Sequence, residues 1–279
     1  MADVKTATTK GANGSRAGKP KNGSHTMINL SIIVFCLVVA HLIFHLVFGN
    51  AANFRDAEKH VPANFQGTIY TGGFVIPILM STFMILLCFV IERALTIMKA
   101  NGKVNNAEFV RKVQYHLANK NIDAALAECD KQAGSVGNVM RAGLLKYRDM
   151  VNNHDLDTDQ KVLSIQKEIE EATALELPML EKNLVFLSTI ASVATLLGLF
   201  GTVLGMIRAF QAMGQAGAPD AAALANGISE ALINTAIGIG TSAIAIITYN
   251  YFTTVIDGIT YGIDESGFTL TQSFAANYK

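Results

Sequence analysis

Long apolar runs alternate with polar segments along this chain, and the runs are the first guide to its organisation. Four of them are long enough to form helices that cross a lipid bilayer, which takes about 20 apolar residues each. They cover residues 27–48, 73–98, 184–210 and 220–255. The fourth run is longer than one crossing requires, so its ends are expected to project beyond the lipid.

The polar region between the second and third runs also shows helical periodicity. In AEFVRKVQYHLANKNIDAALAECDKQ, apolar residues recur at helical spacing around a turn near residues 119–121. Pro178 is expected to kink the helix that leads into the third run. No part of the sequence shows the alternation of a strand. The expected fold is an all-α integral membrane protein with four transmembrane helices and a cytoplasmic helical bundle between the second and third.

Basic residues set the orientation of this arrangement. They are frequent in the tail before residue 27 and between residues 99 and 182, whereas the loop at 50–71 has only Arg55 and Lys59. Cytoplasmic segments carry the excess of Lys and Arg, so both termini are expected to be cytoplasmic. The expected segments are a disordered basic tail (1–26), a transmembrane helix (27–49), an external loop (50–72), a transmembrane helix (73–98), a cytoplasmic helical domain (99–183), a two-helix core (184–256) and a cytoplasmic C-terminal tail (257–279).

Composition supports a membrane protein and removes several other classes. The chain is 51% hydrophobic and only 16% charged, whereas charged residues make up about 25% of a typical soluble domain. The formal net charge is zero, so no nucleic-acid partner is expected. Cys36, Cys88 and Cys129 are far apart and predict neither a disulfide framework nor a zinc site. No nucleophile, zinc-protease or phosphate-loop motif occurs, so we expect neither an enzyme nor a cofactor.

Polar residues inside the fourth run need an explanation. A carboxylate such as Glu230 costs at least ~2.5–3.5 kcal/mol in hydrocarbon. At about 100° per residue, Asn234 and Thr241 share the face of Glu230, while Thr235 and Ser242 lie on a second face. Both faces are therefore expected to contact protein or water. The alternative for Glu230 is a structural hydrogen bond between helices, and for each hydroxyl a bond to its own helical turn.

The third run adds a second polar line and a set of small residues. Ser188, Thr195 and Thr202 recur every seven residues and so share one side of the helix. Small residues let helices approach closely in a membrane. The small residues expected to pack in this way, most simply between copies in an oligomer, are Gly198, Gly201, Gly205, Ala236 and Gly240. A carboxyl that can take up and release a proton, beside hydroxyls that can hold water, suits proton conduction.

Two phrases in these runs carry a family resemblance. LEKNLVFLSTIASVATLLGLFGTVLGMIRAF and GISEALINTAIGIGTSAIAI resemble the ExbB/TolQ proton-channel subunits, and more distantly the flagellar stator protein MotA. The resemblance covers residues 105–252. It implies that Thr202 and Thr235 are pore-lining threonines and that Glu230 is the family's intramembrane glutamate. The remaining residues expected on the ion pathway are Thr195, Ser188, Asn234 and Thr241.

The resemblance also implies an assembly. Family members form a ring, generally a homopentamer, around the transmembrane helices of a small ExbD- or TolR-like partner in the bacterial inner membrane. The partner supplies an aspartate, and proton passage drives movement that a TonB- or TolA-like transducer carries across the periplasm. Energising TonB-dependent transport is the expected function. The alternatives are a Tol-like envelope-maintenance subunit, a motility stator and a non-conducting membrane scaffold, and the alternative ion is sodium.

Two features depart from the family pattern. Thr195 stands where many members have a proline, and the helix at 27–49 with its basic tail is additional. This helix carries His41 and His45 on one face, which allows either a proton relay or metal site, or ordinary hydrogen bonding near the membrane interface. Two histidines are too few for a convincing metal site. If Thr235 faces the pore, Glu230 points toward a helix interface, so Glu230→Gln is expected to assemble but to impair energised function.

Overall fold

The computed structural model describes residues 22–56, 61–215 and 221–278, and this part of the chain is almost entirely helical. An isolated bridge between Phe54 and Pro62 is its one β-type contact. Four helices are long and apolar enough to cross a membrane. The candidate spans lie within Met27–Phe48, Val75–Ala118, Thr158–Gln211 and Ala221–Asn277, and the second and third of these stretches each contain two helices. The all-α fold with four candidate spans is therefore confirmed, and the chain is a multi-pass membrane protein.

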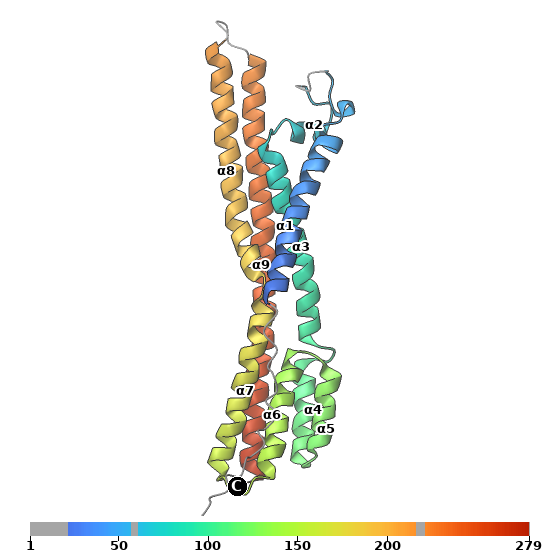
Figure 1. The fold of residues 1–279 in the computed structure, drawn as a ribbon, viewed down its shortest axis with the longest axis vertical. Helices are drawn as coiled ribbons and strands as arrows, with labels where there is room; N and C mark the ends of the chain where they lie inside the picture. Colours follow the sequence, from blue (N-terminus) through green and yellow to red (C-terminus); the bar gives the residue numbers. More distant parts are fainter. Residues whose placement is uncertain (1–21, 57–60, 216–220, 279) are drawn as a thin grey trace, which may run out of the picture.

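The helices form an elongated molecule with two regions along its long axis (Figure 1). One region contains α1, α3, α8 and the first half of α9, and the other contains α4 to α7 and the second half of α9. The elements are α1 (Asn22–Ile43), η1 (Phe44–Phe48), η2 (Ala51–Asn53), α2 (Phe65–Tyr70), α3 (Val75–Asn101), α4 (Asn106–Ala118), α5 (Ile122–Gln132), α6 (Ser135–Val151), α7 (Thr158–Glu181), α8 (Leu184–Gln215) and α9 (Ala221–Asn277).

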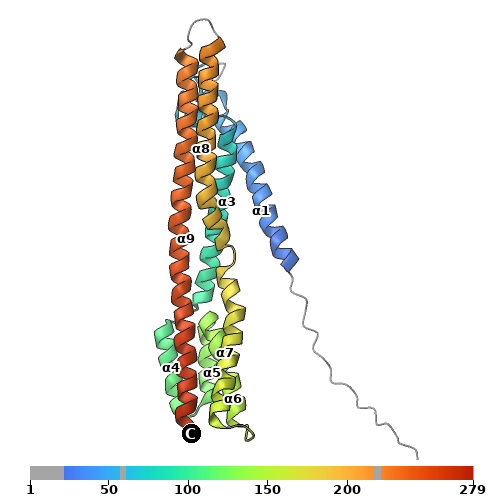
Figure 2. The ribbon, with the colours of Figure 1, turned by 90° about the vertical axis from the view of Figure 1, so that its left-hand side faces the viewer.

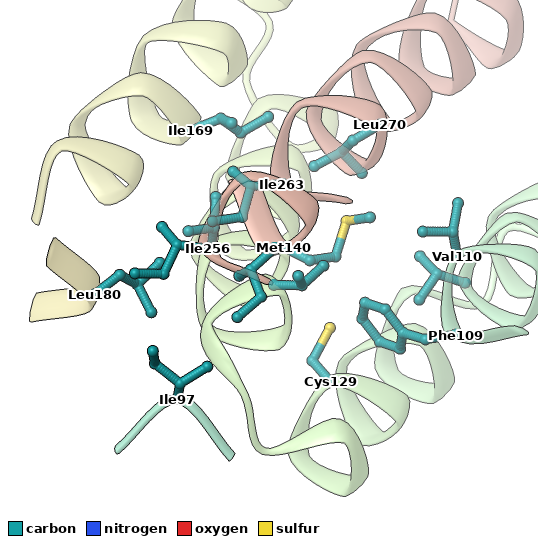
Figure 3. Close-up of a cluster of buried hydrophobic side chains, with 14 of the residues drawn as sticks. Ile97, Phe109, Val110, Cys129, Met140, Ile169, Leu180, Ile256, Ile263 and Leu270 are labelled. Carbon is teal, nitrogen blue, oxygen red and sulfur yellow. The ribbon is translucent and has the colours of Figure 1, made fainter. Parts of the chain in front are cut away.

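The two ends of the chain differ from the segments expected from sequence. Helix α1 begins at Asn22, within the expected basic tail, and residues 1–21 lie outside the described part. Helix α9 continues without a break past residue 256, where a tail was expected to begin. Its second half is a core element of the bundle, because Ile256, Ile263 and Leu270 are almost completely buried. Figure 3 shows these side chains beside residues of α4, α5 and α6. The C-terminal segment is thus part of the bundle and not a separate tail.

The bundle and the membrane helices are joined through a break between α7 and α8. Asp157 precedes α7 and forms a capping box, in which its carboxylate accepts a hydrogen bond from the backbone N–H of Gln160. Pro178 lies inside α7, which ends three residues later at Glu181. Asn183 then adopts a left-handed conformation with φ of 63° before α8 begins. The expected kinked helix is therefore two helices that meet at Lys182–Asn183.

Candidate functional site

Helices α8 and α9 lie side by side over most of their shared length (Figures 1 and 2). Glycines make this close packing possible. A Cβ atom at Gly201 would lie 2.5 Å from Asn234 Cβ, and one at Gly205 would lie 2.8 Å from the Ala231 amide nitrogen. Gly198 likewise faces the backbone of Gly238. These contacts join α8 and α9 of one chain, and the expected packing of Gly198, Gly201 and Gly205 between copies stays a prediction.

Ala236 and Gly240 lie elsewhere on α9. Both are exposed in the single chain. A Cβ at Gly240 would meet no described atom within 4 Å. Together with Ile43, Phe83 and Thr241, Gly240 lines a hollow between α1, α3 and α9 of about 490 Å³. The expected packing of Ala236 and Gly240 against another copy stays a prediction.

The two threonines singled out by the family resemblance meet across the α8–α9 seam. The Thr202 and Thr235 hydroxyls are hydrogen-bonded to each other. Thr202 Oγ1 also lies 3.3 Å from the Ala231 carbonyl oxygen, and Thr235 Oγ1 lies 3.4 Å from that of Gly198. Both residues are half-buried. Thr202 borders an open apolar hollow of about 640 Å³, with Ile207 and Phe210 on the same side of α8. The hydroxyl pair is thus next to a surface that a further helix could cover.

Glu230 lies on a different side of α9 and is paired with a cation. Arg208 Nη1 donates to Glu230 Oε1 at 2.5 Å, and the Glu230 side chain is only 10% exposed. The Arg208 side chain is 46% exposed. Its guanidinium lies 5.5 Å from the centre of the Phe74 ring. The carboxylate is therefore neutralised by a neighbouring helix of the same chain, which removes much of its cost in an apolar environment.

A turn before α3 closes over this ion pair. Gly73 has φ of 75°, which an L-residue adopts only with strain. Gly73 leaves no room for a side chain, because a Cβ there would overlap Glu230 Oε1. Since α3 begins at Val75, Glu230 is level with the end of a spanning helix and not with its middle. A charge near the end of a span costs less than one at its middle, because water and headgroups are closer there.

Asn234 is the most enclosed polar residue at this place. It has no exposed surface, and its Nδ2 donates to the Gly72 carbonyl oxygen at 3.0 Å. Its Oδ1 atom is buried without a hydrogen-bond partner among the described residues. A buried acceptor of this kind is usually satisfied by water. Glu230 and Asn234 thus contact the α2–α3 turn as well as α8, whereas Thr235 is bonded to Thr202 of α8.

The other candidate hydroxyls bond mainly to their own helices. Thr241 Oγ1 donates to the Ile237 carbonyl oxygen at 2.8 Å, and Ser188 Oγ to that of Val185 at 3.2 Å. Thr195 makes a longer bond of 3.5 Å to the carbonyl oxygen of Ala191. For these three residues, the structure shows the local alternative. Ser242, on the second face, instead bridges to α8 by donating to the Ala191 carbonyl oxygen at 2.5 Å.

Arg208 is the residue that sequence reasoning missed. A signal was present, because Arg208 stands at the end of an apolar run away from the basic cytoplasmic region. A cation that violates the positive-inside rule needs a partner, and Glu230 is a carboxylate at the corresponding end of the next run. On α1, His41 Nδ1 lies 2.9 Å from the Leu37 carbonyl oxygen. Among the described residues, no three His, Cys, Asp or Glu side chains are grouped as a metal site would need.

Comparison with known proteins places this helix pair in a family. Residues 132–265 match the profile of the MotA/TolQ/ExbB proton channel family. Over 134 residues the chain is 34% identical to the Tol-Pal system protein TolQ of Pseudomonas aeruginosa, covering 46% of this chain and 58% of that protein. It is 43% identical over 84 residues to TolQ of Haemophilus influenzae, covering 30% of this chain and 37% of that protein. It thus spans less than two thirds of the length of either relative. A biopolymer transport protein ExbB of Neisseria gonorrhoeae is 28% identical over 188 residues, 66% of this chain and 81% of that protein.

Proposed function

Because this chain belongs to the MotA/TolQ/ExbB proton channel family, we propose that it is the ring-forming channel subunit of a motor in a bacterial inner membrane. In this proposal about five copies surround the helices of an ExbD- or TolR-like partner. Protons move between ring and partner, and a TonB- or TolA-like transducer uses the resulting movement. The bundle of α4 to α7 and the second half of α9 lies in the cytoplasm.

The Thr202–Thr235 pair is the observation that carries the proposal. The two hydroxyls come from consecutive spans and are linked to each other, and Thr202 borders an open apolar hollow on α8. A partner helix seated against that hollow would place its carboxylate beside a polar pair in an otherwise apolar wall. Hydroxyls accept and donate, so the pair can hold a water chain or pass a proton without carrying charge itself. The same hydroxyls could coordinate sodium, which the flux measurement below distinguishes.

Glu230 has a supporting role in this mechanism. Its carboxylate is held by Arg208 and covered by the turn at Gly72–Gly73, so it does not face Thr202 and Thr235. A fixed ion pair of this kind positions the periplasmic ends of α8, α9 and α3 relative to one another. Glu230 then tunes assembly or gating, while the threonines contact the moving ion. Asn234, with its unsatisfied Oδ1, lies between these two groups and offers a place for one bound water.

Single substitutions in the reconstituted complex test the proposal. Thr202→Ala and Thr235→Ala are expected to reduce proton flux at least tenfold while the ring and its partner stay assembled in native mass spectrometry. Thr189→Ala is the matched control, because its hydroxyl lies on the same helix α8 and bonds only to the Val185 carbonyl oxygen at 2.7 Å. If the measured flux depends on sodium, the conducted ion is sodium and not the proton. Wild-type flux in both variants, or a chain that never binds a single-span partner, would favour the scaffold.

Energised transport through TonB is the task we favour, and Tol-like envelope maintenance is the second candidate. Relatives named both ExbB and TolQ match the chain. The two tasks give different phenotypes when the gene is deleted. Loss of receptor-dependent uptake with a sound envelope would support the first task. Detergent sensitivity and leakage of periplasmic proteins with normal uptake would support the second.

A further inference from the structure

A second polar site lies at the opposite end of the membrane helices from Glu230. A cavity of about 970 Å³ opens where α1, α3 and the α7–α8 junction meet. Figure 2 shows that α1 leans away from the other helices toward its N-terminal end. The lining residues that matter here are Leu30, Ile33, Phe186, Glu92, Lys182 and Asn183.

The cavity lies where polar and apolar side chains of the lining meet. Three segments far apart in sequence change from polar to apolar at this level, and hydrogen bonds tie them together. Asn29 Nδ2 on α1 donates to Asn183 Oδ1 at 3.0 Å, and Asn183 Nδ2 donates to Glu92 Oε2 on α3 at 3.2 Å. Leu30, Ile33 and Phe186 lie just on the apolar side. The cavity therefore spans the depth where a phospholipid changes from headgroup to acyl chain.

One positive charge in this cavity has no counter-charge among the described residues. Arg93 is 1% exposed and donates from Nε and Nη2 to the two carboxylate oxygens of Glu92, at 2.7 and 2.6 Å. These two residues neutralise each other. Lys182 also lines the cavity, and within the described ranges no carboxylate lies in ion-pair distance of its ammonium group. The lining therefore carries a net charge of about +1 and suits an anionic group that also has apolar substituents.

We propose that this cavity binds one phospholipid from the leaflet on the bundle side. Its phosphate contacts the Lys182 ammonium and the amide of Asn29 or Asn183, while its first acyl carbons pack against Ile33 and Phe186. A free phosphate would satisfy Lys182 but would leave the apolar wall uncovered. Helix α1 supplies one wall and lies outside residues 132–265 that match the family profile. The additional helix thus completes a lipid site at the hinge between membrane helices and bundle, independently of what the channel energises.

Native mass spectrometry of the delipidated complex, titrated with phosphatidylglycerol, tests this site. Lys182→Ala is expected to raise the Kd of the first bound lipid about tenfold, the loss of one charge-assisted contact. Lys103→Ala removes the same charge just beyond the end of α3, is exposed and does not line the cavity. It is expected to leave the Kd unchanged. If both variants weaken lipid binding equally, the effect is a general attraction between basic residues and the lipid headgroup, and the proposal is overturned.

Two further measurements distinguish the contribution of the apolar cavity wall to lipid binding from that of the positive charge. Ile33→Trp fills the apolar part without changing any charge and is expected to weaken lipid binding at least tenfold. Val34→Trp is the matched control, because Val34 is 55% exposed and does not line the cavity. Inorganic phosphate at millimolar concentration is expected not to displace the lipid. Displacement by phosphate, or normal binding in Ile33→Trp, would overturn the proposal. Unchanged copy number and helical circular dichroism confirm that each variant is folded.

Discussion

At the scale of single residues, the Arg208–Glu230 pair has unequal partners. The Glu230 side chain is 10% exposed and that of Arg208 is 46% exposed. Arg208→Gln leaves a buried carboxylate without its cation, so we expect it to lower the free energy of unfolding by about 1–3 kcal/mol. Glu230→Gln is expected to cost less, because the freed guanidinium can reach water. The double variant should recover most of the loss. Unfolding in mixed detergent, followed by circular dichroism, measures all three, and a larger loss in Glu230→Gln would contradict this account.

Cys129 provides a second prediction at the same scale, in the bundle. Burial is the largest cause that raises the pKa of its thiol, to about 12. At pH 8 the thiolate is therefore scarce, and maleimide labelling in the folded protein is expected to be at least 100-fold slower than at an exposed cysteine. Lys131→Cys in a Cys129→Ala background is the control, because the Lys131 side chain is 66% exposed. Equal labelling rates at pH 8 would show that this part of the bundle opens readily.

The same thiol links bundle stability to pH. Its pKa is higher in the folded protein than the ordinary value of 9.0. The folded state therefore holds the proton more tightly than the unfolded state. The contribution of this thiol to the free energy of unfolding is complete below about pH 9 and is lost as the pH rises toward 12. Cys129→Ala is expected to remove that part of the alkaline destabilisation, as measured by denaturant titrations at pH 7 and pH 10.

At the scale of helices, two glycines of α9 predict opposite effects of the same substitution. A Cβ at Gly238 would lie 2.6 Å from the Ala194 carbonyl oxygen and 2.8 Å from Gly198 Cα. Gly238→Ala must therefore push α8 and α9 apart, and we expect a loss of about 1–3 kcal/mol in the free energy of unfolding. Nothing lies within 4 Å of a Cβ at Gly258. Gly258→Ala is expected to gain about 0.5–1 kcal/mol, because alanine favours the helix. A loss in both variants would point to an effect other than helix packing.

These elements also show how far sequence alone could go. Hydropathy located all four spans, and helical geometry separated Thr235 from Glu230 correctly, because both depend only on neighbours along one helix. The Arg208–Glu230 pair and the turn at Gly72–Gly73 depend on which helices meet in space, and periodicity does not contain that information. The helix of the C-terminal segment could be predicted in part from the sequence, because Ile256, Ile263 and Leu270 recur every seven residues. Its polar intervening residues, with Asp257 and Asp264 among them, concealed the pattern.

At the scale of the whole molecule, the length of α9 connects the site to the bundle. Its 57 residues give a helix of about 86 Å, far more than the ~30 Å of a bilayer core. The same helix carries Glu230 and Thr235 near one end and the bundle core residues Ile263 and Leu270 near the other. A continuous helix therefore connects the membrane end of the molecule to the bundle. The break at Lys182–Asn183 gives the neighbouring α7 and α8 a place to bend.

The four candidate spans also predict which ends of the molecule share a compartment. We expect an even number of spans to place both termini on the bundle side, and the many basic residues of 99–182 favour the cytoplasm for that side. In a background without native cysteines, Gln66→Cys on α2 is expected to react with a membrane-impermeant maleimide added to intact spheroplasts. Ala276→Cys, near the end of α9, is expected to react only after the membrane is opened. Both positions are exposed, so access to the reagent is limited by the membrane alone. Labelling of Ala276→Cys in intact spheroplasts would reverse the orientation or remove one crossing, and with it the cytoplasmic assignment of the bundle.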